Sequence, residues 1–556
     1  MRMKPTCSST RRGISSVLPA ALFWIIVILN FCTTYYVTGN ILDSDTSSTL
    51  VFSQHLSEIG KLFSQDWLYS TSIEVISSHL VYMPLFSLLD NWRYIRLIGT
   101  IILQVTYLLS YAFMLRQAGL SKRVFYLSAA ILLLPVSVVH GRIVLYHCYY
   151  IPLLAVAFLI LGLVFRCAKI SNWRKIGAYL SVTALVVLSF LGGLGGVRHL
   201  MITHAPLVLA AFLFCFLDFN QNGQKLSAII SADSVKLLLF SVLSAGASFV
   251  GFLANSVYLC KRFSFVDYSS VTLSIIDPSL IDEMLYGFFH QFGFRENVSM
   301  LSLTGILSLL GFIAGIYCLY AGIQIIKRYK TEDDVNQTVL NTFLLFFTAV
   351  TVFSFVVTGG NTNYHFVLYL AFCLSWVAPL LVSFHDTVSA KKGFSLEKIF
   401  CWITIFILCT NGLANITFFN GNKTFHQIYE GLGFQEMEKK EHLSGAVDYL
   451  TKNGYDIGYA TYWEGNITTE LTNGQVRLIN IQMDDVSGNI VYYDWLTSQY
   501  LREEEKEKPF VLLTVEGRSS FELSDSYQYC TLIYEDQYHC VYDIMNIDTF
   551  IPTLYS

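Results

Sequence analysis

Long apolar runs separated by short polar segments are the feature that most limits how this chain can fold. About 20 consecutive apolar residues are enough to cross a lipid bilayer. Eleven runs approach that length, near residues 14–37, 95–115, 122–139, 149–166, 176–191, 204–217, 236–258, 300–326, 339–358, 366–384 and 398–416. Only 14% of the residues are charged, against about 25% in soluble domains. We therefore predict an α-helical polytopic membrane protein with about eleven transmembrane helices.

Lysine and arginine are distributed unevenly between the segments that connect these runs. With the N-terminus in the cytoplasm, the cytoplasmic segments hold 19 basic residues and the outer segments before residue 420 hold 8. Cytoplasmic loops are enriched in these residues, so this orientation is favoured. The alternative of a cleavable signal peptide is disfavoured, because the first run is too long and no small-x-small cleavage site follows it. We expect a multi-pass plasma-membrane protein with a cytoplasmic N-terminus.

The composition changes after residue 420, where charged residues and turn residues become frequent. We predict a transmembrane domain over residues 1–420 and an extracytoplasmic α/β domain over residues 421–556. Periodicity within the second domain predicts helices near 437–452 and 493–505, strands at 454–462, 475–483 and 509–515, and a hairpin at 527–544. A hairpin that turns at 535–536 would place Cys530 opposite Cys540. These two cysteines could then form a disulfide in an oxidising compartment, and the sequence leaves this question undecided.

A long loop, residues 39–94, follows the first run on the predicted outer side. It begins with two carboxylates, Asp43 and Asp45, close to the membrane surface. Aspartate is also common in solvated turns, which is the alternative interpretation. During glycosyl transfer a carboxylate can deprotonate the acceptor or hold a metal ion. Asp43 and Asp45 are therefore the candidate catalytic residues, and a divalent metal is left open as a cofactor.

Basic and imidazole groups occur in other segments that the same orientation places outside. Arg142 lies within residues 140–147, and Arg198 and His199 lie within the glycine-rich residues 192–204. Arginine is well suited to phosphate oxygens, so we predict that these three residues bind a donor phosphate. Anchoring to lipid headgroups is the alternative for the arginines. For the glycines at 192–196, a loop that cradles a phosphate and helix packing are both left open. Further candidate site residues are His79, His147, Tyr364 and His365. For the three histidines, a structural hydrogen-bonding role is the stronger alternative.

The first outer loop resembles that of the glycosyltransferase C superfamily of polytopic membrane enzymes. Within it, the chain resembles the bacterial relatives of protein O-mannosyltransferases and of the lipid A aminoarabinose transferase. Many members have an Asp-Glu pair fifteen residues before a Gly, with a Trp shortly after. Asp45 lies fifteen residues before Gly60, and Trp67 follows. The chain departs from the pattern in having Thr46 for Glu, Met83-Pro84-Leu85 for Pro-Pro-Leu, and Tyr364-His365 for an Arg-Tyr pair.

The resemblance implies a membrane glycosyltransferase that moves a sugar from a polyprenyl phosphate to a cell-envelope glycan, lipid or protein. It implies that Asp45 acts as general base or metal ligand and that Asp43 assists it. The sequence has neither a P-loop nor a GxGxxG motif between a strand and a helix, and no basic tract indicates nucleic-acid binding. Two alternatives stay open: a transporter or flippase of a lipid-linked glycan, and a non-catalytic surface-glycan assembly protein. The residues identify neither the sugar nor the acceptor.

Overall fold

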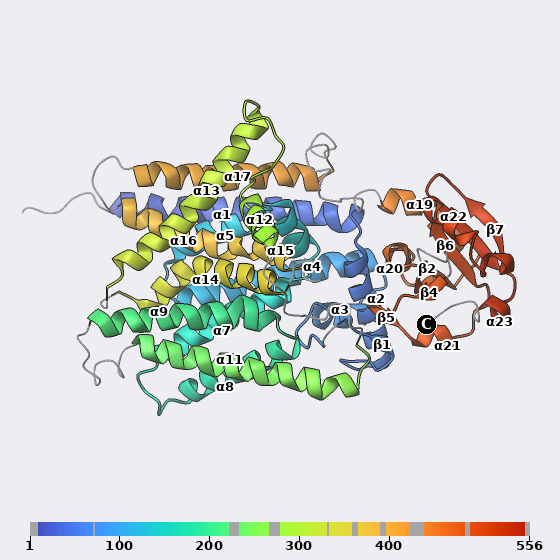
Figure 1. The fold of residues 1–556 in the computed structure, drawn as a ribbon, viewed down its shortest axis with the longest axis horizontal. Helices are drawn as coiled ribbons and strands as arrows, with labels where there is room; N and C mark the ends of the chain where they lie inside the picture. Colours follow the sequence, from blue (N-terminus) through green and yellow to red (C-terminus); the bar gives the residue numbers. More distant parts are fainter. Residues whose placement is uncertain are drawn as a thin grey trace, which may run out of the picture.

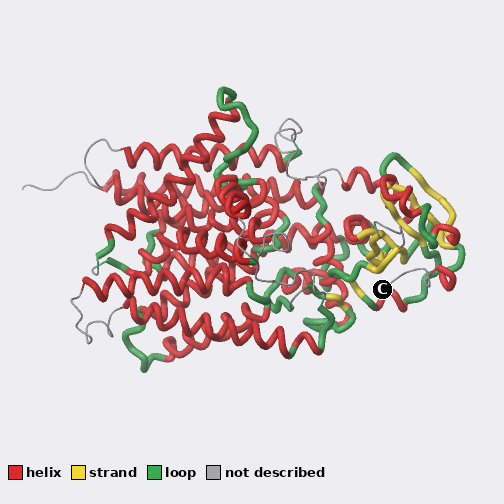
Figure 2. Tube along the Cα trace, in the orientation of Figure 1, coloured by secondary structure: helices red, strands yellow, loops and turns green. Residues whose placement is uncertain are grey.

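The computed structural model describes residues 9–70, 73–221, 233–265, 278–330, 333–358, 365–389, 396–421, 439–483 and 490–550. Figure 1 shows a bundle of long helices with a smaller domain at one end, and Figure 2 shows that this domain holds the six-stranded sheet. Within the described ranges, ten helical segments are long and apolar enough to cross a membrane. The chain is a polytopic α-helical membrane protein with a C-terminal α/β domain, as predicted. The division at residues 420–421 stays a prediction.

The long helices of the bundle are α1 (Ser9–Asn40), α4 (Trp92–Gln117), α7 (Ile151–Ala168), α8 (Ile176–Leu194), α9 (Ala205–Gln221), α11 (Asp233–Val257), α13 (Leu303–Arg328), α14 (Val335–Val357), α16 (Leu374–Ser389) and α17 (Leu396–Phe419). The shorter elements that precede or connect them are η2 (Leu200–His204), η3 (Leu259–Lys261), α12 (Pro278–His290), α15 (His365–Tyr369) and η4 (Leu370–Cys373).

The third expected span, residues 122–139, is not a continuous helix. Helix α5 (Lys122–Leu132) ends shortly before Pro135, and α6 (Val138–His140) continues into a π-helical turn, η1 (Gly141–Tyr146). Proline disfavours helical conformation in the residue before it. Non-helical backbone at membrane depth is tolerated where protein surrounds it, and residues 128–138 are all buried. The break sets the position of η1, which carries Arg142.

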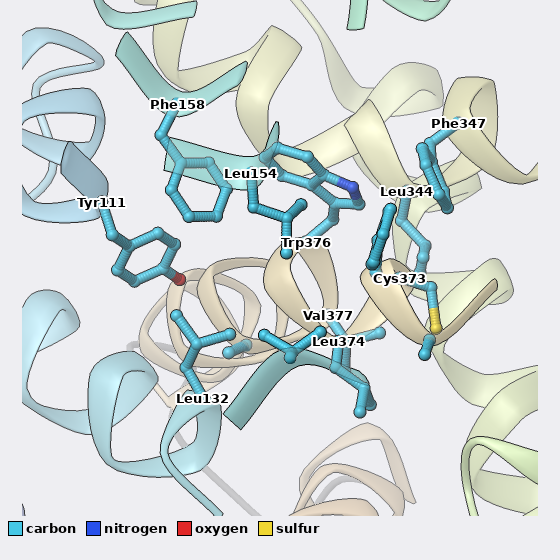
Figure 3. Close-up of a cluster of buried hydrophobic side chains, with 14 of the residues drawn as sticks. Tyr111, Leu132, Leu154, Phe158, Leu344, Phe347, Cys373, Leu374, Trp376 and Val377 are labelled. Atoms are coloured by element: carbon cyan, nitrogen blue, oxygen red, sulfur yellow. The ribbon is translucent and has the colours of Figure 1, made fainter. Parts of the chain in front are cut away.

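A cluster of buried side chains packs the bundle around this break. Figure 3 shows Trp376 of α16 among side chains from α4, α5, α7 and α14, with Leu132 at the end of α5 nearby. The ring centroid of Trp376 lies 5.5 Å from that of Phe158 and 4.5 Å from that of Phe343. Aromatic pairs of this kind contribute about 0.5–1.5 kcal/mol beyond the area they bury. The short helix α5 itself packs against α1 and α16.

The C-terminal domain is built on a six-stranded sheet of order β4-β3-β2-β6-β8-β7. The central strand β2 is parallel to both β3 and β6, and the other neighbours are antiparallel. Both faces of the sheet carry apolar clusters, which explains why the central strands are nearly continuous apolar runs. Its elements are α19 (Lys439–Lys452), β2 (Ile457–Thr461), α20 (Tyr462–Leu471), β3 (Arg477–Met483), β4 (Ile490–Tyr492), β5 (Thr497–Ser498), α21 (Tyr500–Glu503), β6 (Phe510–Thr514), α22 (Val515–Phe521), η7 (Tyr527–Tyr529), β7 (Cys530–Glu535), β8 (His539–Ile544) and α23 (Ile547–Phe550).

The hairpin between β7 and β8 turns about two residues later than expected. Cys540 lies opposite Glu535, and Cys530 lies opposite Ile544. The two cysteines are therefore not paired, and both thiols are free. The helix expected at 493–505 is also shorter, because part of that segment forms β5.

The first outer loop joins the bundle to the C-terminal domain. Its short strand β1 (Trp67–Leu68) pairs antiparallel with β5. Helix α2 (Ser44–Ile59) contacts both α3 (His79–Phe86) and α20, and Figure 1 shows α2, α3 and β1 at the end of the bundle that faces the domain. Nine residues of α2 are buried. Helix α2 is a buried connector, and its Ser44 and Ser47 side chains donate hydrogen bonds to α20 of the C-terminal domain.

Candidate active site

Asp43 is fixed as the N-terminal cap of α2. Its carboxylate accepts hydrogen bonds from the backbone N–H groups of Asp45 (3.0 Å) and Thr46 (3.2 Å). Its Oδ2 also accepts from a guanidinium nitrogen of Arg142 at 3.0 Å. Burial raises the pKa of Asp43, but the interactions with His147 and Arg142 and the hydrogen bonds outweigh burial and hold the pKa below its ordinary value. Asp43 is only 1% exposed, and its carboxylate contacts the start of α2 and Arg142.

Asp45 lies in the first turn of α2 and is differently placed. Its side chain lines a cavity of about 440 Å³, and its Oδ1 accepts a hydrogen bond of 2.6 Å from the hydroxyl of Tyr462. Burial raises the pKa of Asp45 to about 6, and the charge of Asp43 adds to the shift. The Tyr462 bond and Arg142 act in the opposite direction. At neutral pH the carboxylate is ionised, and its pKa is close enough to neutrality to accept and release a proton.

Two arginines lie on the walls of the same cavity, each beside a carboxylate. Arg142 on η1 pairs with Asp43, and Arg198, at the start of the turn before η2, pairs with Glu74 of the first outer loop. Both arginine side chains are 26% exposed. A guanidinium has five N–H donors, and Arg198 can therefore bind a phosphate oxygen while it keeps its contact with Glu74.

The glycine-rich segment before Arg198 serves helix packing. A Cβ on Gly193 would lie 1.9 Å from the backbone oxygen of Ser248, so only glycine lets α8 approach α11 this closely. Gly196 has φ of +88°, a left-handed conformation that favours glycine. Of the two interpretations that the sequence left open, the helix-packing one describes this segment, and the turn at Gly196 sets the position of Arg198.

The predicted histidine candidates are separated by the structure. His79 and His147 line the cavity, whereas His199 packs its ring against Gly192 beside a smaller adjoining pocket of about 30 Å³. Burial lowers the pKa of His79 to about 4 and the pKa of His147 to about 3. Burial likewise lowers the pKa of His199 to about 3, so all three rings are neutral at pH 7. Tyr364 lies outside the described residues, as does the side chain of His365, the first residue of α15.

A buried ionic network lies behind the cavity and fixes the tautomer of His147. A guanidinium nitrogen of Arg96 lies 3.2 Å from Nδ1 of His147, and because arginine only donates, Nδ1 is the acceptor. The proton of the neutral ring is therefore on Nε2. The Arg96 side chain is fully buried and pairs with Glu470 of α20 at 3.1 Å. Ser47 of α2 donates a 2.5 Å hydrogen bond to the other oxygen of Glu470.

The described residues do not supply a ready-made metal site. No group of three or more His, Cys, Asp or Glu side chains in these parts of the chain is arranged to hold a metal ion. The oxygens of Asp43 already accept from two backbone groups and Arg142, and Oδ1 of Asp45 accepts from Tyr462.

Sequence reasoning missed three residues of the cavity and its surroundings. Glu74 is the only acidic residue within residues 67–89, a composition signal that could have identified it. Trp495, which the C-terminal domain contributes to the cavity wall, has no comparable signal. Tyr462 has no local signal either, because its partner Asp45 is 417 residues away in the sequence.

No protein-family model and no curated protein matches this chain. Among solved structures, ArnT from Cupriavidus metallidurans bound to undecaprenyl phosphate is similar, with a TM-score of 0.49, 9% identity, and coverage of 96% of this chain and 98% of that one. The Archaeoglobus fulgidus oligosaccharyltransferase in complex with Zn and sulfate has a TM-score of 0.44, 12% identity, and coverage of 95% of this chain and 72% of that one. The same oligosaccharyltransferase tethered to an acceptor peptide has a TM-score of 0.45, 12% identity, and coverage of 96% and 74%. These proteins belong to the glycosyltransferase C superfamily, the superfamily that the first outer loop of this chain resembles.

Proposed function

We propose that this protein is a membrane glycosyltransferase that moves a sugar from a polyprenyl phosphate to a cell-envelope glycan, lipid or protein. The observation that carries the proposal is Asp45, a carboxylate with a pKa of about 6 in a cavity that Arg142 and Arg198 also line. A general base works best when its pKa lies near the operating pH. Arginine side chains offset the negative charge that a leaving phosphate gains. The cavity combines these two requirements.

In the proposed reaction, Asp45 accepts the proton of an acceptor hydroxyl while the acceptor oxygen bonds to the anomeric carbon of the donor. The bond between that carbon and the phosphate oxygen breaks, and the polyprenyl phosphate leaves with the bonding electrons. Arg142 and Arg198 offset the charge on the departing phosphate. Asp43 does not line the cavity and acts by holding Arg142 and the start of α2.

The rest of the cavity suits a sugar. Its volume of about 440 Å³ lies within the range of about 300–1,000 Å³ that small-molecule pockets occupy. Trp67, Tyr69 and Trp495 present aromatic rings to it, and hydroxyl side chains of the first outer loop lie beside them. Aromatic rings supply apolar area for the faces of a pyranose, and hydroxyls supply hydrogen bonds for its edges.

The proposed location of the reaction is the outer face of the plasma membrane. The cavity lies at the end of the bundle that faces the C-terminal domain, between the first outer loop and residues 495–496. The distribution of lysine and arginine puts this end of the bundle outside. The donor would reach the cavity from the outer leaflet, and the C-terminal domain would be extracytoplasmic.

Replacing Arg198 with alanine should weaken binding of the donor phosphate. A hydrogen bond to a charged group contributes about 1.5–3 kcal/mol, so we expect the Kd for a short-chain polyprenyl phosphate to rise at least about tenfold. The measurement is a binding titration with purified protein in nanodiscs. Arg262→Ala is the matched control, because Arg262 is exposed and lies outside the cavity, and it should leave the Kd unchanged. An unchanged Kd for Arg198→Ala would contradict the assignment.

The rate of sugar transfer should depend on pH with a midpoint near 6. Asp45 is active as a base only when it is deprotonated, and its pKa is about 6. The kcat/KM should therefore be constant above about pH 7 and fall about tenfold per unit below the midpoint. His79 and His147, with pKa values of about 4 and 3, do not change charge in this range. A profile that stays flat down to pH 4.5 would exclude Asp45 as the titrating base.

A further inference from the structure

The carboxyl ends of the parallel strands in the C-terminal domain face the cavity. Strand β2 ends at Thr461, and Tyr462 is the first residue of α20. β2 lies between β3 and β6, and α20 connects it to β3, so the strand order reverses at β2. Ligands of open α/β sheets bind beyond the carboxyl ends of the strands at such a point. In this protein, the side chain at that point contacts Asp45.

Tyr462 is held firmly in this position. It is 3% exposed, and its ring centroid lies 5.4 Å from that of Trp463 and 5.6 Å from that of Tyr493. Ser44 of α2 donates a hydrogen bond of 2.8 Å to the carbonyl of Trp463, which ties the start of α20 to the start of α2. The bond of 2.6 Å from the Tyr462 hydroxyl to Oδ1 of Asp45 has the length expected of a hydroxyl bound to an ionised carboxylate.

We propose that Tyr462 is a positioning residue for the transfer reaction: it holds Oδ1 of Asp45 and thereby assigns proton transfer to Oδ2. This inference rests on the proposed function. The inference makes the C-terminal domain part of the catalytic centre. The general base, Asp45, lies in the first outer loop, whereas the residue that orients it, Tyr462, belongs to α20. Without the docked domain, Asp45 would lack this hydrogen bond.

The charged groups around Asp45 determine how loss of the Tyr462 hydroxyl changes the pKa of Asp45. Asp43, at the start of the same helix, disfavours the ionised form of Asp45, whereas Arg142 on η1 favours it. From α20, the Tyr462 hydroxyl favours the ionised form. Tyr150 lies on the neighbouring wall, and across the cavity Arg198 and Glu74 form an ion pair. Removal of the hydroxyl therefore leaves a less favourable balance for the carboxylate, and the pKa of Asp45 rises.

The test compares Tyr462→Phe with the full-length wild type in nanodiscs, with transfer from a short-chain polyprenyl-phosphate sugar measured between pH 5 and 9. We expect the plateau rate of Tyr462→Phe to fall at least about tenfold and the midpoint of its pH profile to rise by about one unit, because a bond to the ionised carboxylate is lost. Tyr527→Phe is the matched control. Tyr527 belongs to the same domain, is 38% exposed and lies outside the cavity, so the rate and midpoint of Tyr527→Phe should equal those of the wild type. A wild-type rate and midpoint in Tyr462→Phe would overturn the inference.

A thermal-unfolding cycle tests the contact without relying on activity. Tyr462→Phe should lower the Tm in the wild-type background and have no further effect in an Asp45→Ala background, because its partner is absent there. Equal Tm shifts in both backgrounds would overturn the contact itself. If Tyr462→Phe is coupled to Asp45 but the wild type transfers no sugar, the proposed function fails and the positioning role fails with it. If the wild type is active, Asp45→Asn is inactive and Tyr462→Phe keeps the wild-type profile, only the positioning role fails.

Discussion

Replacing Asp45 with asparagine should abolish sugar transfer while the protein still inserts and folds normally. Asparagine has the same shape as aspartate, and its carbonyl oxygen can still accept the hydrogen bond from Tyr462. It cannot accept a proton from the acceptor, so the contribution of the general base, about 10²–10⁴-fold in rate, is lost. The kcat for transfer from a polyprenyl-phosphate sugar, measured on purified protein, should fall by this factor.

Two further measurements separate loss of chemistry from loss of structure. The Tm of Asp45→Asn should not fall, because removal of a buried charge next to Asp43 relieves repulsion. The Kd for a polyprenyl phosphate should not rise, since Asp45 does not attract the phosphate. Glu58→Gln, at the exposed far end of α2, is the matched control and should keep its wild-type rate. Transfer by Asp45→Asn at close to the wild-type rate would refute the proposed function of this residue.

The same assay separates the proposed enzyme from a transporter of a lipid-linked glycan. A transporter forms no covalent product, and its ionisable groups are expected near the middle of the membrane-spanning helices. The ionisable groups that line the cavity lie instead at one end of the bundle, beside the C-terminal domain. This placement favours chemistry at the membrane surface over passage through the bundle.

The helices of the bundle were predictable because hydrophobicity is a local property of the sequence. Ten of the eleven expected spans correspond to long apolar helices among the described residues. The exception, residues 122–139, has enough apolar residues to span, but Pro135 and the surrounding protein allow a break that hydropathy cannot detect. In the C-terminal domain the hairpin was predicted, whereas its register was not, because turn position depends on contacts beyond the hairpin.

Residues of the candidate site were predictable only where a motif within one short segment of the sequence identifies them. The spacing from Asp45 to Gly60 selects Asp45 from the pair, and the structure places this residue in the cavity. The partners of the site are long-range: Glu74 and Arg198 are 124 residues apart, and Asp45 and Tyr462 are 417 apart. His199 is adjacent to Arg198 in sequence, but it lines only the smaller pocket, whereas Arg198 lines both pockets.

Replacing Glu470 with methionine should destabilise the protein more than any other single change proposed for it. Glu470 is the carboxylate partner of Arg96, whose side chain is fully buried, and the two lie 3.1 Å apart. Removal of one partner of a buried ion pair leaves an uncompensated charge and costs about 3–5 kcal/mol. The change should also lower transfer, because Arg96 contacts His147 and Ser47 bonds to Glu470 at the start of α2. The Tm and, where unfolding is reversible, the free energy of unfolding in detergent report the loss.

Two controls identify the buried charge as the cause. Lys452→Ala breaks the Lys452–Asp448 pair in the same domain, whose side chains are 75% and 69% exposed, and should cost less than about 1 kcal/mol. The double variant Arg96→Met/Glu470→Met removes both charges and should recover most of the stability, because a buried pair can be replaced by apolar groups at little cost. Recovery of stability without recovery of transfer would show that the pair also orders the site. A double variant as unstable as Glu470→Met would instead attribute the loss to packing of α20, and the ion pair would have no special part in docking the domain.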